Sequence, residues 1–156
     1  MFAFKIIASE LKNFMNLLLR EDTFDQFEAR DVEVVNFTKF LISGIEEEIS
    51  EGEEDGQRRK ICSWSVLRPY IFHIIKGEKR PKLIKIAFSP PPSSWASIHP
   101  NGSAFFLNMQ YNGEEVLFTT AVSEKSFSLD KQVEAAWEEY VKEFFRSKHI
   151  VISTQL

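Results

Sequence analysis

The alternation of apolar and polar positions predicts helices in three parts of the chain. Residues 133–145 show the clearest pattern, because their large apolar side chains recur at steps of three and one. We expect Asp130 to cap this helix, and we expect its aromatic stripe to cover the core of the protein. Weaker apolar stripes predict helices over 11–19, with Ser9 as the N-cap, and over 66–75.

Runs rich in β-branched and aromatic residues predict strands, at 2–7, 27–36, 39–46, 82–88, 104–111 and 114–122, with a short additional strand at 60–63. Asn112-Gly113 lies between the last two main strands and predicts a hairpin with these residues at its centre. That turn would pair Met109 with Val116 and Leu107 with Phe118. The predicted core face of the hairpin comprises Phe105, Leu107, Met109, Val116 and Phe118, whereas residues 150–156 have the pattern of a tail.

The order of these elements is β-α-β-β-(β)-α-β-β-β-α. Because the hairpin requires antiparallel pairing, we expect an α+β fold in which helices cover an antiparallel sheet. The length is that of one domain, so we expect a single domain over 1–156. Two loops interrupt it: an acidic segment at 46–57, expected to be mobile, and an irregular proline-rich segment at 89–103.

The amino-acid composition and the net charge limit the classes of function that the protein could have. The net charge of −4 argues against a dedicated nucleic-acid binder, though a local basic patch remains compatible with it. Cys62 is the single cysteine, which excludes an internal disulfide and a zinc site that needs several thiolates. The first residues do not resemble a signal peptide, and no run is long enough to span a membrane. We therefore expect a cytoplasmic protein with no membrane partner.

No catalytic or cofactor motif is evident. The three histidines lie far apart, without the spacing of a metal site, and the glycines form no phosphate-binding loop, so neither a metal nor a nucleotide cofactor is predicted. Cys62 precedes a predicted helix, where a thiol can become reactive, but a small buried side chain is the simpler interpretation. An enzyme with an unrecognised site near Cys62, Trp64 and Arg68 stays open.

Two features could recognise a ligand. The segment Trp64-x-x-Leu67-Arg68-Pro69 begins a predicted helix, with Pro69 expected in the first turn, and could form a recognition patch. Its structural alternative has Trp64 in the core and Arg68 paired with an acidic residue such as Asp25 or Asp130. The basic stretch 76–85 could contact phosphates or simply be a solvated turn. The candidate recognition patch comprises Trp64, Arg68, Pro69, Lys76, Lys79, Arg80 and Lys82.

Short motifs along most of the chain resemble a small uncharacterised family of clostridial-type bacteria, a domain of unknown function. These motifs are Phe24-Asp25, Trp64-x-x-Leu67-Arg68-Pro69, Ile75-Lys76-Gly77, Phe106-Leu107-Asn108 with Tyr111, Thr119-Thr120, Phe127, Asp130-Lys131 and Trp137. The resemblance implies a bacterial cytosolic protein and supplies no activity. The order of elements, with two successive β-α-β-β units, also looks like the repeating unit of DNA sliding clamps.

These observations favour a non-enzymatic cytosolic binding module with a protein partner. The first alternative is a nucleic-acid-associated accessory protein, sliding-clamp-like in its topology, that uses the basic stretch 76–85. The second alternative is an enzyme with an unrecognised site. The sequence leaves the ligand and the oligomeric state open.

Overall fold

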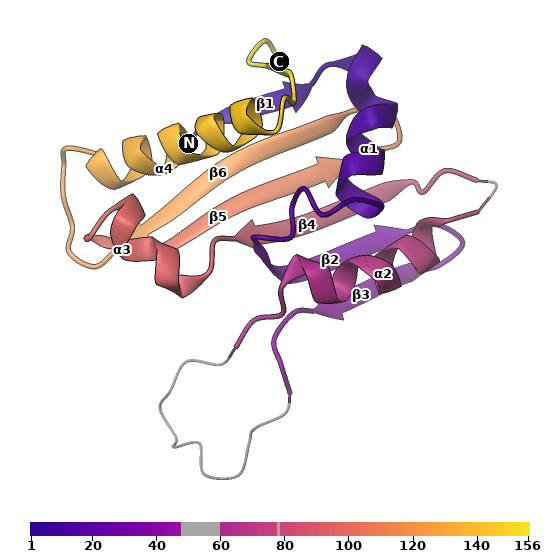
Figure 1. Ribbon diagram of the computed structural model, residues 1–156, viewed down its shortest axis with the longest axis horizontal. Helices are drawn as coiled ribbons and strands as arrows, with labels where there is room; N and C mark the ends of the chain where they lie inside the picture. The colour runs from indigo at the N-terminus through magenta and orange to yellow at the C-terminus, as the bar shows by residue number, and fades with distance from the viewer. Residues whose placement is uncertain (48–59, 78) are drawn as a thin grey trace.

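Seven β-strands form one antiparallel sheet in the computed structural model, which describes residues 1–47, 60–77 and 79–156 (Figure 1). The strands lie in the order β3-β2-β4-β5-β6-β1-β7. Their bounds are β1 Ala3–Ile6, β2 Glu28–Val35, β3 Lys39–Ser43, β4 Leu83–Ser89, β5 Gly102–Tyr111, β6 Val116–Glu124 and β7 Ile152–Ser153. The α-helices among these residues are α1 Leu11–Leu19, α2 Trp64–Ile75, α3 Trp95–Ile98 and α4 Gln132–Ser147. The predicted α+β fold is confirmed.

The two predicted β-α-β-β units are interleaved in this sheet. β1 pairs with β6 near one edge, and β2 pairs with β4 toward the other edge. The second unit therefore lies between β1 and the β2–β3 pair of the first unit. Most of the predicted acidic loop at 46–57 lies outside the described residues.

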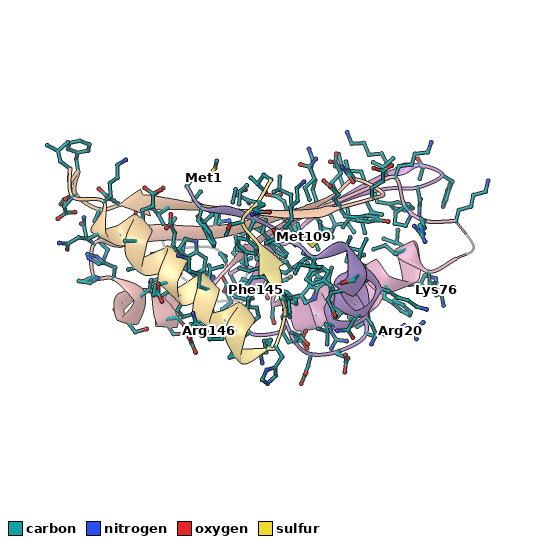
Figure 2. The ribbon with its side chains drawn as sticks, turned by 90° about the horizontal axis from the view of Figure 1, so that it is seen from above. Met1, Arg20, Lys76, Met109, Phe145 and Arg146 are labelled. Atoms are coloured by element: carbon teal, nitrogen blue, oxygen red, sulfur yellow. The ribbon has the colours of Figure 1, made fainter. Side chains whose placement is uncertain are left out.

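All four helices lie on one side of the sheet, as the edge-on view in Figure 2 shows. Side chains alternate between the two faces of a strand, so a row of paired residues across the sheet points to one side. One such row faces the helices and is at most 2% exposed: Phe4, Phe118, Met109, Ile86 and Val32. The next row, on the open side, comprises Lys5, Leu117, Gln110, Lys85, Glu33 and Leu41.

Phenylalanine rings fill the space between the helices and the sheet. Phe24 lies among the rings of Phe14, Phe88 and Phe118, at centroid separations of 5.5–6.4 Å. The predicted core role of the last helix is confirmed, because its stripe is buried: Val133, Trp137, Val141, Phe144 and Phe145. Figure 2 shows Phe145 between α4 and the sheet.

The predicted register of the β5–β6 hairpin is wrong by two residues. Met109 pairs with Phe118 and Leu107 with Thr120, because the turn is centred on Gly113 and Glu114. The Asn112 side-chain oxygen accepts hydrogen bonds from the Glu114 and Glu115 amides, each at 2.9 Å, which places Asn112 at the first corner of the turn. A shift of two residues keeps each side chain on its face, so the predicted burial of the hairpin core is confirmed.

Three predicted helix starts also differ. A 3-10 turn at Ala8–Glu10 precedes α1, so Ser9 is not its N-cap. Ser63 caps α2 by accepting the Ser65 amide at 3.2 Å, which starts the helix early and places Pro69 in its second turn. The N-cap of α4 is Lys131 in a left-handed conformation, although Asp130 still accepts the amide of Gln132 at 3.1 Å.

Segments predicted to be irregular contain short elements. The proline-rich segment 89–103 forms a 3-10 turn at Pro92–Ser94 and the single turn α3, and Trp95 donates to the Pro90 carbonyl at 3.0 Å. The tail forms β7, which pairs with β1. Residues 60–63 make isolated bridges to Glu28 and Ile45 rather than a strand. Within the described residues, we find no helix with the length and apolar character of a membrane span.

Candidate functional site

Trp64 and Arg68 hold α2 against the segment before β2. Trp64 is fully buried and donates through Nε1 to the Leu18 carbonyl at 3.0 Å. Arg68 donates from Nε and Nη2 to the two carboxylate oxygens of Asp25, at 3.0 and 2.9 Å. The hydrogen bond with Asp25 raises the pKa of Arg68 above its ordinary value. These contacts agree with the second interpretation of the sequence, in which Trp64 lies in the core and Arg68 pairs with an acidic residue. That residue is Asp25 rather than Asp130.

The other four basic residues of the predicted patch lie at the opposite end of α2 from Trp64 and Arg68. Lys76, Lys79, Arg80 and Lys82 line a pocket of about 500 Å³ beside the β2–β3 turn. Figure 2 shows Lys76 at the end of the molecule. Because α2 has twelve residues, it is about 18 Å long. The residues of the predicted patch therefore form two groups, one at each end of α2. Pro69, between them, is exposed.

The open face of the sheet contains a larger hollow, of about 670 Å³, that spans β3, β2, β4, β5 and β6. Ala87 lies at its centre, between Asp31 on β2 and Asn108 on β5, and its small side chain leaves space above the sheet. Leu41 and Leu117 border it. The alternation in 104–111 predicts a polar face of the hairpin, but the sequence does not indicate which strands lie beside it.

Several polar side chains in this hollow have no hydrogen bond or ion pair within the described part of the chain: Asp31, Lys85, Asn108, Gln110 and Thr119. Their neighbours are paired. The Glu33 carboxylate forms an ion pair with the Lys39 ammonium group at 3.0 Å. On the far side of the hollow, Lys5 forms an ion pair with Glu115 at 2.9 Å. The hollow therefore offers a carboxylate, an ammonium group, two amides and a hydroxyl to a ligand.

The cysteine and the histidines do not form a reactive or metal-binding site among the described residues. Burial, and then the charge of Glu46, raise the pKa of the Cys62 thiol, which lowers its thiolate fraction at neutral pH. His99 accepts the Asn101 amide through Nδ1 at 3.0 Å and so helps to hold its loop. Across the described ranges, no three histidine, cysteine or acidic side chains lie close enough together to hold a metal ion.

Comparisons with known proteins identify a family but no activity. No curated protein and no solved structure gives a significant match to this chain. A family model described as a family of unknown function, DUF5721, matches residues 17–153. The match covers α2, α3 and α4, the last three residues of α1, and every described strand except β1. The chain belongs to this family of unknown function, DUF5721.

Proposed function

We propose that this protein is a non-enzymatic binding module that holds a partner protein on the open face of its sheet. The observation that carries the proposal is the hollow over Ala87, where five polar side chains surround a small residue and have no side-chain partner among the described residues. These groups stand on adjacent strands of one sheet, so their positions are already set before a partner arrives. Such preorganisation reduces the entropy lost on binding.

The dimensions of the face suit a macromolecule. Seven strands spaced about 4.8 Å apart, with about six residues each, give a surface on the order of 700 Å². A standard protein interface buries about 800 Å² on each partner. A partner protein would use the face as a whole, whereas a small molecule would occupy only the centre.

The residues of the hollow indicate the chemistry of the partner. Leu41 is 71% exposed and, with Leu117, offers apolar contact at two sides of the hollow. The Asp31 carboxylate forms no ion pair among the described residues. We therefore propose a partner segment with an apolar side chain over Ala87 and a lysine or arginine facing Asp31.

We further propose a cytosolic protein of clostridial-type bacteria. A single cysteine, which cannot form an internal disulfide, supports a reducing compartment. Partial burial and a raised pKa support a structural role for this thiol. The same raised pKa argues against the alternative of a cysteine enzyme, because a protonated thiol is a poor nucleophile.

Site-specific photo-cross-linking in the native cells tests the proposal. A photoreactive amino acid is placed at Gln110, which is exposed on the open face, and in a second protein at Glu139, which is exposed on α4. We expect a nuclease-insensitive protein adduct from position 110 that is absent from position 139. The adduct is then identified, and the purified partner is titrated against wild type and Ala87→Arg.

A charged side chain at position 87 fills the hollow without entering the core, so Ala87→Arg should fold normally and lose the partner. Circular dichroism checks the fold of the variant. Equal adducts from both positions, or a purified partner that binds wild type and Ala87→Arg alike, would show that the open face is not the interface.

A further inference from the structure

The pocket beside the end of α2 combines three kinds of side chain that the chain brings together from distant segments. Asn36 and Phe37 come from the β2–β3 turn, and the basic residues come from the connection between α2 and β4. The Lys82 amide donates to the Val35 carbonyl at 2.7 Å, which fixes this connection against the turn. The pocket is thus a property of the tertiary fold.

Its charge is opposite to that of the protein. Residues 76–82 contain four cations and one anion, Glu78, for a net charge of +3, whereas the whole chain has −4. None of the four cations forms an ion pair within the described residues. The C-terminal dipole of α2 is equivalent to only about half a negative charge, so most of the positive charge remains available to an anion.

Phe37 supplies a flat apolar surface at the same pocket. Its side chain is 88% exposed, and its ring packs edge to face on Phe40 with centroids 5.8 Å apart. An exposed ring held in place beside cations resembles the stacking surfaces that proteins offer to nucleobases.

Asn36 supplies a hydrogen-bond acceptor. Its side-chain amide donates to the Ile74 carbonyl at 3.0 Å, which fixes the side chain against the end of α2. Its Oδ1 atom is buried and has no hydrogen-bond partner within the described residues. Buried acceptors are usually satisfied, so a ligand N–H or O–H donor would fill an unmet acceptor once the side chain turns this oxygen toward the pocket.

We infer that this pocket binds a nucleoside phosphate, with the base on Phe37 and the phosphate among Lys76, Lys79, Arg80 and Lys82. Phosphate alone would use the cations but neither Phe37 nor Asn36. A volume of about 500 Å³ accommodates one nucleotide unit. The unit can come from a free nucleotide or from a nucleic-acid strand. This inference is independent of the proposed function, which concerns the opposite side of the sheet.

Titrations of the purified protein followed by ¹H–¹⁵N NMR test the inference. The probes are adenosine monophosphate, adenosine, inorganic phosphate and a short oligodeoxyadenylate, each up to about 5 mM at low salt. We expect adenosine monophosphate to shift the amides of residues 36–38 and 74–82. It should bind at least about tenfold more tightly than adenosine or phosphate, because only it uses both parts of the pocket.

Three variants assign the contacts. Phe37→Ala should weaken the binding of adenosine monophosphate at least about fivefold, through the loss of stacking. Lys79→Gln with Arg80→Gln should weaken it at least about tenfold, through the loss of charged contacts. Lys125→Gln with Lys131→Gln removes the same charge from the β6–α4 connection and should leave binding unchanged. All five side chains are exposed, so each variant should fold.

The probes also separate the two sources of the ligand. Binding of the mononucleotide indicates a free nucleotide, whereas binding of the oligonucleotide alone, at the same amides, indicates a strand. Equal affinity for phosphate and adenosine monophosphate would overturn the inference. Amide shifts confined to residues other than 36–38 and 74–82 would also overturn it. The absence of any shift with both nucleotide probes would overturn it as well.

Discussion

Replacement of Trp137 by alanine tests whether α4 seals the core. The indole is fully buried, lies 5.4 Å from the ring of Phe105 between centroids, and donates through Nε1 to the Phe106 carbonyl at 2.8 Å. The helix therefore contacts β5 by packing and by a hydrogen bond. If this architecture is correct, truncation leaves a cavity in the core and removes the hydrogen bond to the Phe106 carbonyl.

The expected loss follows from these contacts. Truncation of a buried tryptophan to alanine costs about 3–5 kcal/mol. A domain of this size is stable by about 5–15 kcal/mol, so Trp137→Ala should remove a large share of the total. The melting temperature should fall by roughly 8–15 °C. Trp137→Phe retains most of the ring and loses the hydrogen bond, so it should cost less, about 1–3 kcal/mol.

Urea unfolding followed by circular dichroism measures both variants against wild type. Phe127→Ala is the matched control, because Phe127 is 86% exposed and its removal should change the unfolding free energy by less than about 0.5 kcal/mol. The midpoint should shift while the slope stays constant. A loss below about 1 kcal/mol for Trp137→Ala would refute the core role of α4.

Three further predictions follow from local contacts. Arg68→Ala should lower the unfolding free energy by about 1–3 kcal/mol in urea titrations, and the loss should shrink when Asp25 is also replaced, because the two side chains bond each other. The Ser128 hydroxyl, the Gln132 amide and the charge of His99 lower the pKa of the Asp130 carboxyl. Its contribution to stability is thus complete above the unfolded-state pKa and is lost as the pH falls through the lower folded pKa. NMR titration should show this low pKa, and Ser128→Ala should raise it; an unchanged pKa would exclude the hydroxyl as its cause. Iodoacetamide should alkylate Cys62 more slowly in the native protein than in urea, because burial raises the thiol pKa, and equal rates would contradict that cause.

The family resemblance and the element pattern were both accessible from the sequence. Short-range periodicity reports which residues share one side of a helix or strand, and this was sufficient for the stripe of α4 and the buried side of the β5–β6 hairpin. It was also sufficient to identify two roles for Arg68, but not to choose between Asp25 and Asp130 as its partner. That choice depends on how α2 packs against the segment after α1.

Register and helix starts depended on single hydrogen bonds that periodicity does not report. The Asn112 side chain accepts two backbone amides and so moves the hairpin turn by one position, which shifts every pair by two. The Ser63 hydroxyl starts α2 early enough to put Pro69 in the second turn. Neither hydrogen bond changes the pattern of apolar residues, so this pattern does not report the register or the helix start.

Both candidate binding surfaces were decided by the tertiary structure alone. The open face requires the strand order, which places Ala87 between Asp31 and Asn108. The pocket at the end of α2 requires the β2–β3 turn to meet residues 76–82, some forty residues later in the chain. Local sequence determined which side chains these segments carry. Long-range pairing and packing decided which of them lie together, because contacts between distant segments leave no periodic trace in the sequence.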